Sequence, residues 1–190
     1  IIIIVIFAMQ NNLDMKIAVF CSANDSIAPA YFKAAEELGK WMADSGHTLV
    51  YGGQNRGLMR CVGEAVHNGG GQIIGVIPQI LANSGQRPDC LDVEIPCDNL
   101  SDRKDLMLAQ ADVCVALPGG IGTLDEVFTV VASHNIGYHC KMAILYNVAG
   151  FWDKTIEMLD DMQRRGFMRG HWTDYIKVVE SIEQLKALIL

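Results

Sequence analysis

The segment DVCVALPGGIGTLDE, residues 112–126, runs from an apolar stretch through a glycine turn into a sequence with helical character. Its first half indicates a strand buried on both faces, because its apolar residues are nearly continuous and do not alternate with polar ones. Three glycines then occupy three of the four positions 119–122. A tight turn needs only one or two glycines, so this turn exposes backbone that something other than protein can contact.

The alternation of apolar runs with amphipathic stretches extends over the chain from Lys16. We predict strands at 16–23, 47–53, 72–78, 112–118, 141–147 and 175–180, and helices at 29–46, 57–70, 99–111, 123–135, 151–166 and 181–190. Residues 79–98, which include Pro88 and Pro96, are predicted to form an irregular surface excursion. Strands that alternate with helices predict a sheet covered on both faces. The fold class is therefore α/β, a Rossmann-like three-layer α/β/α domain with a mainly parallel sheet.

Length and charge narrow the classes of function. The 190 residues suffice for one domain with a sizeable core. The formal net charge of -7 argues against a nucleic-acid binder, because neutralising phosphates needs clustered Lys and Arg. A small anionic ligand remains compatible, since a local site can oppose the global charge.

The first residues differ in character from the rest. IIIIVIFA, residues 1–8, is too short to span a bilayer, and no positive residue precedes it as in a secretory signal. MKIAVF at 15–20 resembles a natural start, so we expect residues 1–14 to be an extension without function and residues 15–190 to form a single Rossmann-like domain. The six cysteines contain no C-x-x-C pair and indicate neither a zinc site nor a disulfide framework. We therefore expect a cytoplasmic protein with no membrane association.

Two glycine turns follow predicted strands, YGGQNRGLM at residues 51–59 and PGGIGT at residues 118–123. Ligands of open parallel sheets bind beyond the carboxyl ends of the strands, and a helix N-terminus offers them unpaired N–H groups. Glycine lets an anion approach this backbone with no Cβ in the way. CSANDS, after the first strand, lacks the G-x-G-x-x-G spacing of dinucleotide sites, and no G-x-x-x-x-G-K-S/T loop occurs. The pattern favours a mononucleotide.

The same residues also have purely structural interpretations. Thr123 and Glu126 match the S/T-x-x-D/E capping box, in which Glu126 would only cap its own helix. Gly52 and Gly53 match an ordinary strand-to-helix turn. Two such turns at one edge of the sheet shift the balance towards a ligand site.

The signature PGGIGTLDE, residues 118–126, resembles the P-G-G-x-G-T-x-x-E motif of the LOG-type phosphoribohydrolases. Further matching segments follow the same order, so the resemblance runs from about Lys16 to the C-terminus; they are VFCSA at 19–23, YGGQNRGLM at 51–59, GVIP at 75–78 and DRKDLM at 102–107. Members of that family hydrolyse the N-glycosidic bond of nucleoside 5′-monophosphates to free base and ribose 5-phosphate. Their older label, lysine decarboxylase, would require a lysine that holds pyridoxal phosphate, and the motif contains none.

The resemblance implies roles for individual residues. Glu126 is the implied catalytic carboxylate, which stabilises a positively charged ribose and orients water, and Arg103 is the second implied catalytic residue. The implied substrate- and phosphate-binding residues are Gly119, Gly120, Ile121, Gly122, Thr123, Asp125, Lys104, Gly52 and Gly53. Without the resemblance, Arg103 and Lys104 would be assigned to a solvated helix face. The signature reverses that assignment for Arg103 and, to a lesser extent, for Lys104.

The resemblance also implies the partners. It implies a small nucleoside monophosphate as ligand, no metal or organic cofactor, no nucleic acid, and a homodimer or higher homo-oligomer.

Several positions depart from the family pattern. Gln54 stands where the family usually has a third glycine, Arg60 where GLMG would end in glycine, and Ser101 in place of a frequent His. Behind the signature, Ser133 and Asn135 replace the usual Trp and Gln. Phosphate and ribose recognition are therefore expected to persist, whereas a strict cytokinin preference is not. We expect AMP or a related purine mononucleotide, with prenylated forms accepted.

A different class of function uses the same architecture. A carrier protein could bind a nucleotide or a phosphorylated cofactor without cleaving it, but a pure carrier has no reason to keep both Glu126 and Arg103. A nicotinamide-dependent dehydrogenase is disfavoured by the missing fingerprint.

Overall fold

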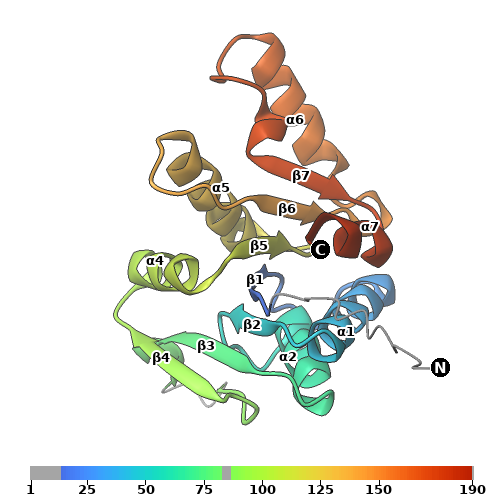
Figure 1. Cartoon of the computed structure of the whole chain (residues 1–190), viewed down its shortest axis with the longest axis vertical. Coiled ribbons are helices and arrows are strands. Elements are labelled where there is room, and N and C mark those ends of the chain that lie inside the picture. The colour runs from blue at the N-terminus through green and yellow to red at the C-terminus, as the bar shows by residue number, and fades with distance from the viewer. Residues whose placement is uncertain (1–13, 83–86, 190) are drawn as a thin grey trace, which may run out of the picture.

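A computed structural model describes residues 14–82 and 87–189, whose strands form a seven-stranded sheet (Figure 1). The strands are β1 (Lys16–Phe20), β2 (Thr48–Tyr51), β3 (Ile73–Pro78), β4 (Val93–Cys97), β5 (Val113–Ala116), β6 (Ala143–Tyr146) and β7 (Ile176–Val179). Their order is β4-β3-β2-β1-β5-β6-β7, and every pairing is parallel. The predicted parallel sheet is confirmed.

Helices cover both faces of the sheet. They are α1 (Pro29–Asp44), α2 (Gly57–Asn68), the short α3 (Gln79–Ala82), α4 (Leu100–Gln110), α5 (Ile121–Asn135), α6 (Asp153–Arg164) and α7 (Ile182–Ile189), with 3-10 turns at Val148–Gly150 and Trp172–Asp174. One apolar core unites the sheet with α1, α2 and α7, and the other unites it with α4, α5 and α6. These two cores separate three layers, as the sequence predicted.

The carboxyl ends of β1 and β5 mark the point where the strand order reverses. From β1 the chain proceeds to β2 on one side, whereas β5 pairs with the other side of β1. The loops that leave these two strands therefore diverge and open a crevice, the usual ligand position in such sheets. A hydrogen bond of 3.1 Å from the Ser22 N–H to the Pro118 carbonyl ties the two loops together at its base.

The prediction of an irregular excursion at residues 79–98 was wrong at both of its ends. Residues 79–82 form α3, and β4 pairs in parallel with β3 over five residues, including Ile77 with Pro96. Because β4 is an edge strand, Pro96 can occupy it without removing a hydrogen bond that a further strand would need. Only one of its five residues, Cys97, is buried, so it lacks the continuous apolar run that marks the central strands.

The predicted extension at residues 1–14 lies outside the described residues except for Asp14. No helix in the described part of the chain is long and apolar enough to cross a membrane.

Candidate functional site

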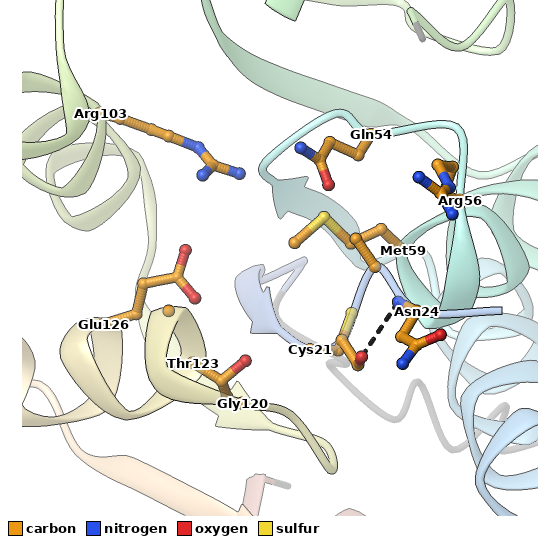
Figure 2. A pocket seen from close by; sticks show the side chains of 12 residues that line it. Cys21, Asn24, Gln54, Arg56, Met59, Arg103, Gly120, Thr123 and Glu126 are labelled. Carbon is orange, nitrogen blue, oxygen red and sulfur yellow. Dashed lines mark hydrogen bonds between the residues drawn. The ribbon is translucent and has the colours of Figure 1, made fainter. Parts of the chain in front are cut away.

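A cleft of about 470 Å³ opens at the carboxyl ends of the strands (Figure 2). The loops after β1, β2 and β5 form it together with the first turns of α2, α4 and α5. Its lining residues are Cys21, Ser22, Ala23, Asn24, Gln54, Arg56, Met59, Arg103, Gly120, Gly122, Thr123 and Glu126. Five of the residues singled out in the sequence thus meet in one cavity, namely Arg103, Gly120, Gly122, Thr123 and Glu126.

Helix α5 begins two residues earlier than predicted, and this excludes the capping box. Its N-cap is Gly120, which has no side chain to cap the helix, so Thr123 lies within the first turn. Glu126 follows in the second turn and faces the cleft, too far along the helix to cap it. Thr123 is buried, and a Cβ at Gly119 would lie only 2.1 Å from its Oγ1. Gly119 is therefore glycine because the Thr123 hydroxyl packs against it.

The first turn of α5 presents bare backbone to the cleft. A Cβ at Gly120 or at Gly122 would meet nothing within 4 Å, so packing does not require either glycine. The side chain between them, Ile121, points away and is 82% exposed. The N–H groups of this turn have no partner within the helix. They can donate to an anion bound in the cleft, with the partial positive charge of the helix end favouring it.

Glu126 is a carboxylate held in a poorly hydrated place. Its side chain lies in the cleft wall and is only 7% exposed. Burial raises the pKa of this carboxyl to about 7; the guanidinium of Arg103 acts in the opposite direction, and the carboxylate of Asp125 adds to the increase. A carboxyl that titrates near neutral pH can hold or release a proton at the pH of the cell.

Arg103 projects into the same cleft from α4. The N-cap residue Asn99 fixes the start of that helix, since its side-chain oxygen accepts from the N–H groups of Ser101 at 2.9 Å and Asp102 at 3.0 Å. Arg103 is only 8% exposed, yet its Nε and Nη2 atoms have no hydrogen-bond partner among the described residues. Figure 2 shows its guanidinium and the Glu126 carboxylate extending into one cavity without a hydrogen bond between them. Buried N–H groups without a hydrogen-bond partner indicate a ligand that accepts hydrogen bonds from them.

Gly52 makes room for this guanidinium. A Cβ added at Gly52 would lie 1.3 Å from Nη2 of Arg103, which is impossible without displacing the side chain. Gly53 has a different reason to be glycine, because its φ of +64° lies in the left-handed region and a Cβ there would meet Ile77 at 2.7 Å. Neither glycine lines the cleft itself.

Lys104 and Asp125 come together outside the cleft lining. The Nζ of Lys104 donates to both carboxylate oxygens of Asp125, at 2.7 and 2.8 Å, and links α4 to α5. Each residue is the chain neighbour of a cleft residue, Arg103 or Glu126. The contact of Lys104 and Asp125 with nucleotide stays a prediction, and so does that of Ile121.

The predicted site residues leave out the side chains of the wall opposite α5, although the sequence analysis singled out two of its segments, VFCSA at 19–23 and YGGQNRGLM at 51–59. Cys21 to Asn24 follow β1, and Gln54, Arg56 and Met59 belong to the turn and helix after β2. Burial raises the pKa of the Cys21 thiol well above its usual range, so this cysteine stays a neutral lining group. The signal that could have found these residues is their position at the carboxyl end of a strand next to the reversal of strand order.

In the described residues, no three side chains of His, Cys, Asp or Glu are grouped closely enough to hold a metal ion.

Solved structures share this fold. A molybdenum cofactor binding protein of Rippkaea orientalis superimposes with a TM-score of 0.71 at 22% identity, over 93% of this chain and 98% of its own. A Moco carrier protein of Chlamydomonas reinhardtii gives a TM-score of 0.70 at 24% identity, over 93% and 95%. At these identities the likeness establishes the fold alone.

Curated relatives are closer in sequence. A probable cytokinin riboside 5′-monophosphate phosphoribohydrolase of Oryza sativa subsp. japonica is 39% identical over 80% of this chain and 67% of its own. A cytokinin riboside 5′-monophosphate phosphoribohydrolase of Arabidopsis thaliana is 35% identical over 80% and 72%. The family model described as "possible lysine decarboxylase" matches residues 59–189, which include Arg103, the whole glycine signature and all of α2 except its first two residues. The chain therefore belongs to this family, together with the cytokinin riboside 5′-monophosphate phosphoribohydrolases.

Proposed function

We propose that the protein hydrolyses the N-glycosidic bond of purine nucleoside 5′-monophosphates, releasing the free base and ribose 5-phosphate. One observation carries the proposal: Glu126 and Arg103, both buried and not paired with each other, face a cleft whose edge is the bare first turn of α5. Membership of a family with phosphoribohydrolases supports the same reaction.

The phosphate would bind at the start of α5. The backbone N–H groups at residues 119–123 donate to its oxygens, and the Thr123 hydroxyl is a further donor within the cleft. Gly120 and Gly122 let the anion reach this backbone because no side chain stands there. The anchored phosphate then holds the ribose over the second turn of the helix, where Glu126 lies.

Glu126 and Arg103 would act on the sugar. As the bond between C1′ and the base nitrogen breaks, its electron pair leaves with the base and positive charge develops on the ribose. The ionised Glu126 stabilises this charge and orients the water that attacks C1′; one water proton ends on the departing base and the water oxygen becomes the new hydroxyl. Arg103, with free donors in the cleft, binds the ribose hydroxyls or phosphate oxygens and thereby positions C1′ beside the carboxylate.

The decisive experiment is release of free base from a panel of nucleotides. The panel contains AMP, GMP, CMP, isopentenyladenosine monophosphate and, as the unphosphorylated control, adenosine. We expect release from purine monophosphates and none from adenosine, because the phosphate supplies the anchor at α5. Saturable nucleotide binding without release from any of them would overturn the hydrolase and favour a carrier of the same fold.

The pH dependence should follow the titration of Glu126. The ionised form performs the catalytic step, and its pKa is raised to about 7, so kcat/KM should rise about 10-fold per pH unit below that value and level off above it. A pH–rate profile between about pH 5.5 and pH 8.5 measures this. A profile that is flat, or that falls as the pH rises, would show that the ionised carboxylate is not the active form.

The assembly and compartment belong to the same proposal. Ile136 and Tyr138 expose their apolar side chains just beyond the end of α5, which supports a contact between copies of the chain in a homodimer or larger homo-oligomer. Every cysteine is free, three of them buried, which supports the reducing cytoplasm as its location.

A further inference from the structure

The turn between β2 and α2 contributes a polar side chain to the cleft that the proposed reaction does not use. Gln54 lines the cavity, and Figure 2 shows its side-chain amide pointing into it, across from Arg103 and beside Met59. The amide makes no hydrogen bond to the other residues drawn there. A planar group with one donor end and one acceptor end thus faces the space open to a ligand.

The lining residues extend from the start of α5 towards this amide. Gly120 and Thr123 lie at the start of α5, and Glu126 and Arg103 come next along the wall. Gln54 lies across the cleft from Arg103, and both lie on the side of the cavity away from Thr123. If the phosphate binds at α5 and C1′ at Glu126, the group attached to C1′ extends towards Gln54.

The neighbours of Gln54 suit a purine. Met59 is buried and lines the same wall, so its flexible thioether side chain offers an apolar, polarisable surface to the face of a ring. The amide can then meet the edge of that ring. Adenine presents a donor, N6–H, next to an acceptor, N1 or N7, and a carboxamide pairs with such an edge through two hydrogen bonds. An alkyl group on N6 leaves one N–H for this contact.

We infer that Gln54 is a specificity-determining residue that reads the donor–acceptor edge of adenine in the substrate. This inference rests on the proposed function for the position of the nucleotide. The side chain at position 54 would thus select the base. A relative with glycine at this position has no such side chain.

Exchange of the amide for a carboxylate tests the inference. The carboxylate of Gln54→Glu can only accept hydrogen bonds. It therefore repels N1 or N7 of adenine, which are also acceptors, and accepts instead from the N1–H and N2–H donors of guanine. The ratio of kcat/KM for AMP to kcat/KM for GMP should fall by about 10-fold or more in Gln54→Glu, the discrimination of one bidentate contact. Gln54→Gly should lower kcat/KM for AMP by about 10-fold and bring the ratio closer to one.

The matched control is Gln72→Glu, which adds the same charge at an exposed glutamine outside the cleft and should leave the ratio unchanged. Melting temperatures confirm that all variants fold. A Gln54→Glu enzyme that loses activity on both nucleotides equally, or on neither, would overturn the inference.

A failure of the proposed function can be distinguished from a failure of this inference. If the wild type releases no base, the reaction is wrong, but the inference is still tested by the affinities for AMP and GMP in equilibrium titrations. The ratio of the two dissociation constants should then change on Gln54→Glu in the same direction. An unchanged ratio in the titrations would overturn the inference by itself.

Discussion

The variant Glu126→Gln should hydrolyse nucleoside monophosphates about 1,000-fold more slowly than the wild type, because it loses both the charge opposite the cationic sugar and the acceptor that orients water. Glutamine keeps the shape of the side chain, so the phosphate anchor at α5 is unaffected. The loss should appear in kcat, with AMP still binding. Single-turnover rates and an equilibrium titration measure the two quantities.

The same variant should be more stable than the wild type at alkaline pH. Burial raises the pKa of Glu126 from 4.5 to about 7, so the folded chain holds this proton more tightly than the unfolded chain. The stability that comes from the neutral carboxyl is complete below pH 4.5 and is lost as the pH rises through about 7. Glu126→Gln has no ionisable group at this position and does not lose this stability. Its melting temperature at alkaline pH should therefore be about 5 °C above that of the wild type.

These two results together distinguish a functional carboxylate from a structural one. A residue kept for stability would lower the melting temperature when replaced. If Glu126→Gln retained full activity, or were less stable than the wild type at alkaline pH, the assignment of Glu126 would be wrong.

Gly52→Ala should reduce kcat/KM by about 100-fold, although position 52 does not line the cleft, because small displacements of a catalytic group have effects of this size. The new Cβ would lie 1.3 Å from Nη2 of Arg103, so the guanidinium must leave its place. The backbone itself tolerates alanine, since Gly52 has no positive φ. The activity should fall much more than the stability.

The control for crowding is Gly75→Ala in β3, whose new Cβ would lie 2.8 Å from the end of Leu91 and outside the cleft. It should retain its activity. A double-mutant cycle with Arg103→Ala then identifies the cause. Once the guanidinium is absent, Gly52→Ala should cost nothing further. Additive losses would show that Gly52 acts independently of Arg103.

The local pattern of residues was enough to predict most of the fold. Apolar runs marked six of the seven strands, all except β4, and the amphipathic stretches between them marked the long helices. β4 was not predicted because its sequence, VEIPC, has no continuous apolar run and contains a proline, which an edge strand tolerates. The predicted start of α5 was wrong because Gly120, which has no capping side chain, ends up at the N-cap.

The candidate site also has a part that the sequence predicted and a part that only the structure shows. The glycine turn, Glu126 and Arg103 could be named from the signature, since each belongs to a short motif. The sequence alone could not show that Gly52 accommodates Arg103, or that Lys104 pairs with Asp125. It also did not bring Gln54 into the cleft. Residues 52 and 103 are far apart in the chain, and only the strand order and the helix packing bring them together.

The amino-acid sequence by itself determined the α/β class, the parallel sheet and the glycine turn that opens α5, because periodicity and turn chemistry act over a few neighbouring residues. The tertiary structure decided which side chains lie in the cleft and what surrounds them. Burial of Glu126, which raises its pKa, and the unpaired donors of Arg103 exist only because the loops after β1, β2 and β5 meet where the strand order reverses. Desolvation and long-range contact are properties of the packed molecule, and no short stretch of sequence records them.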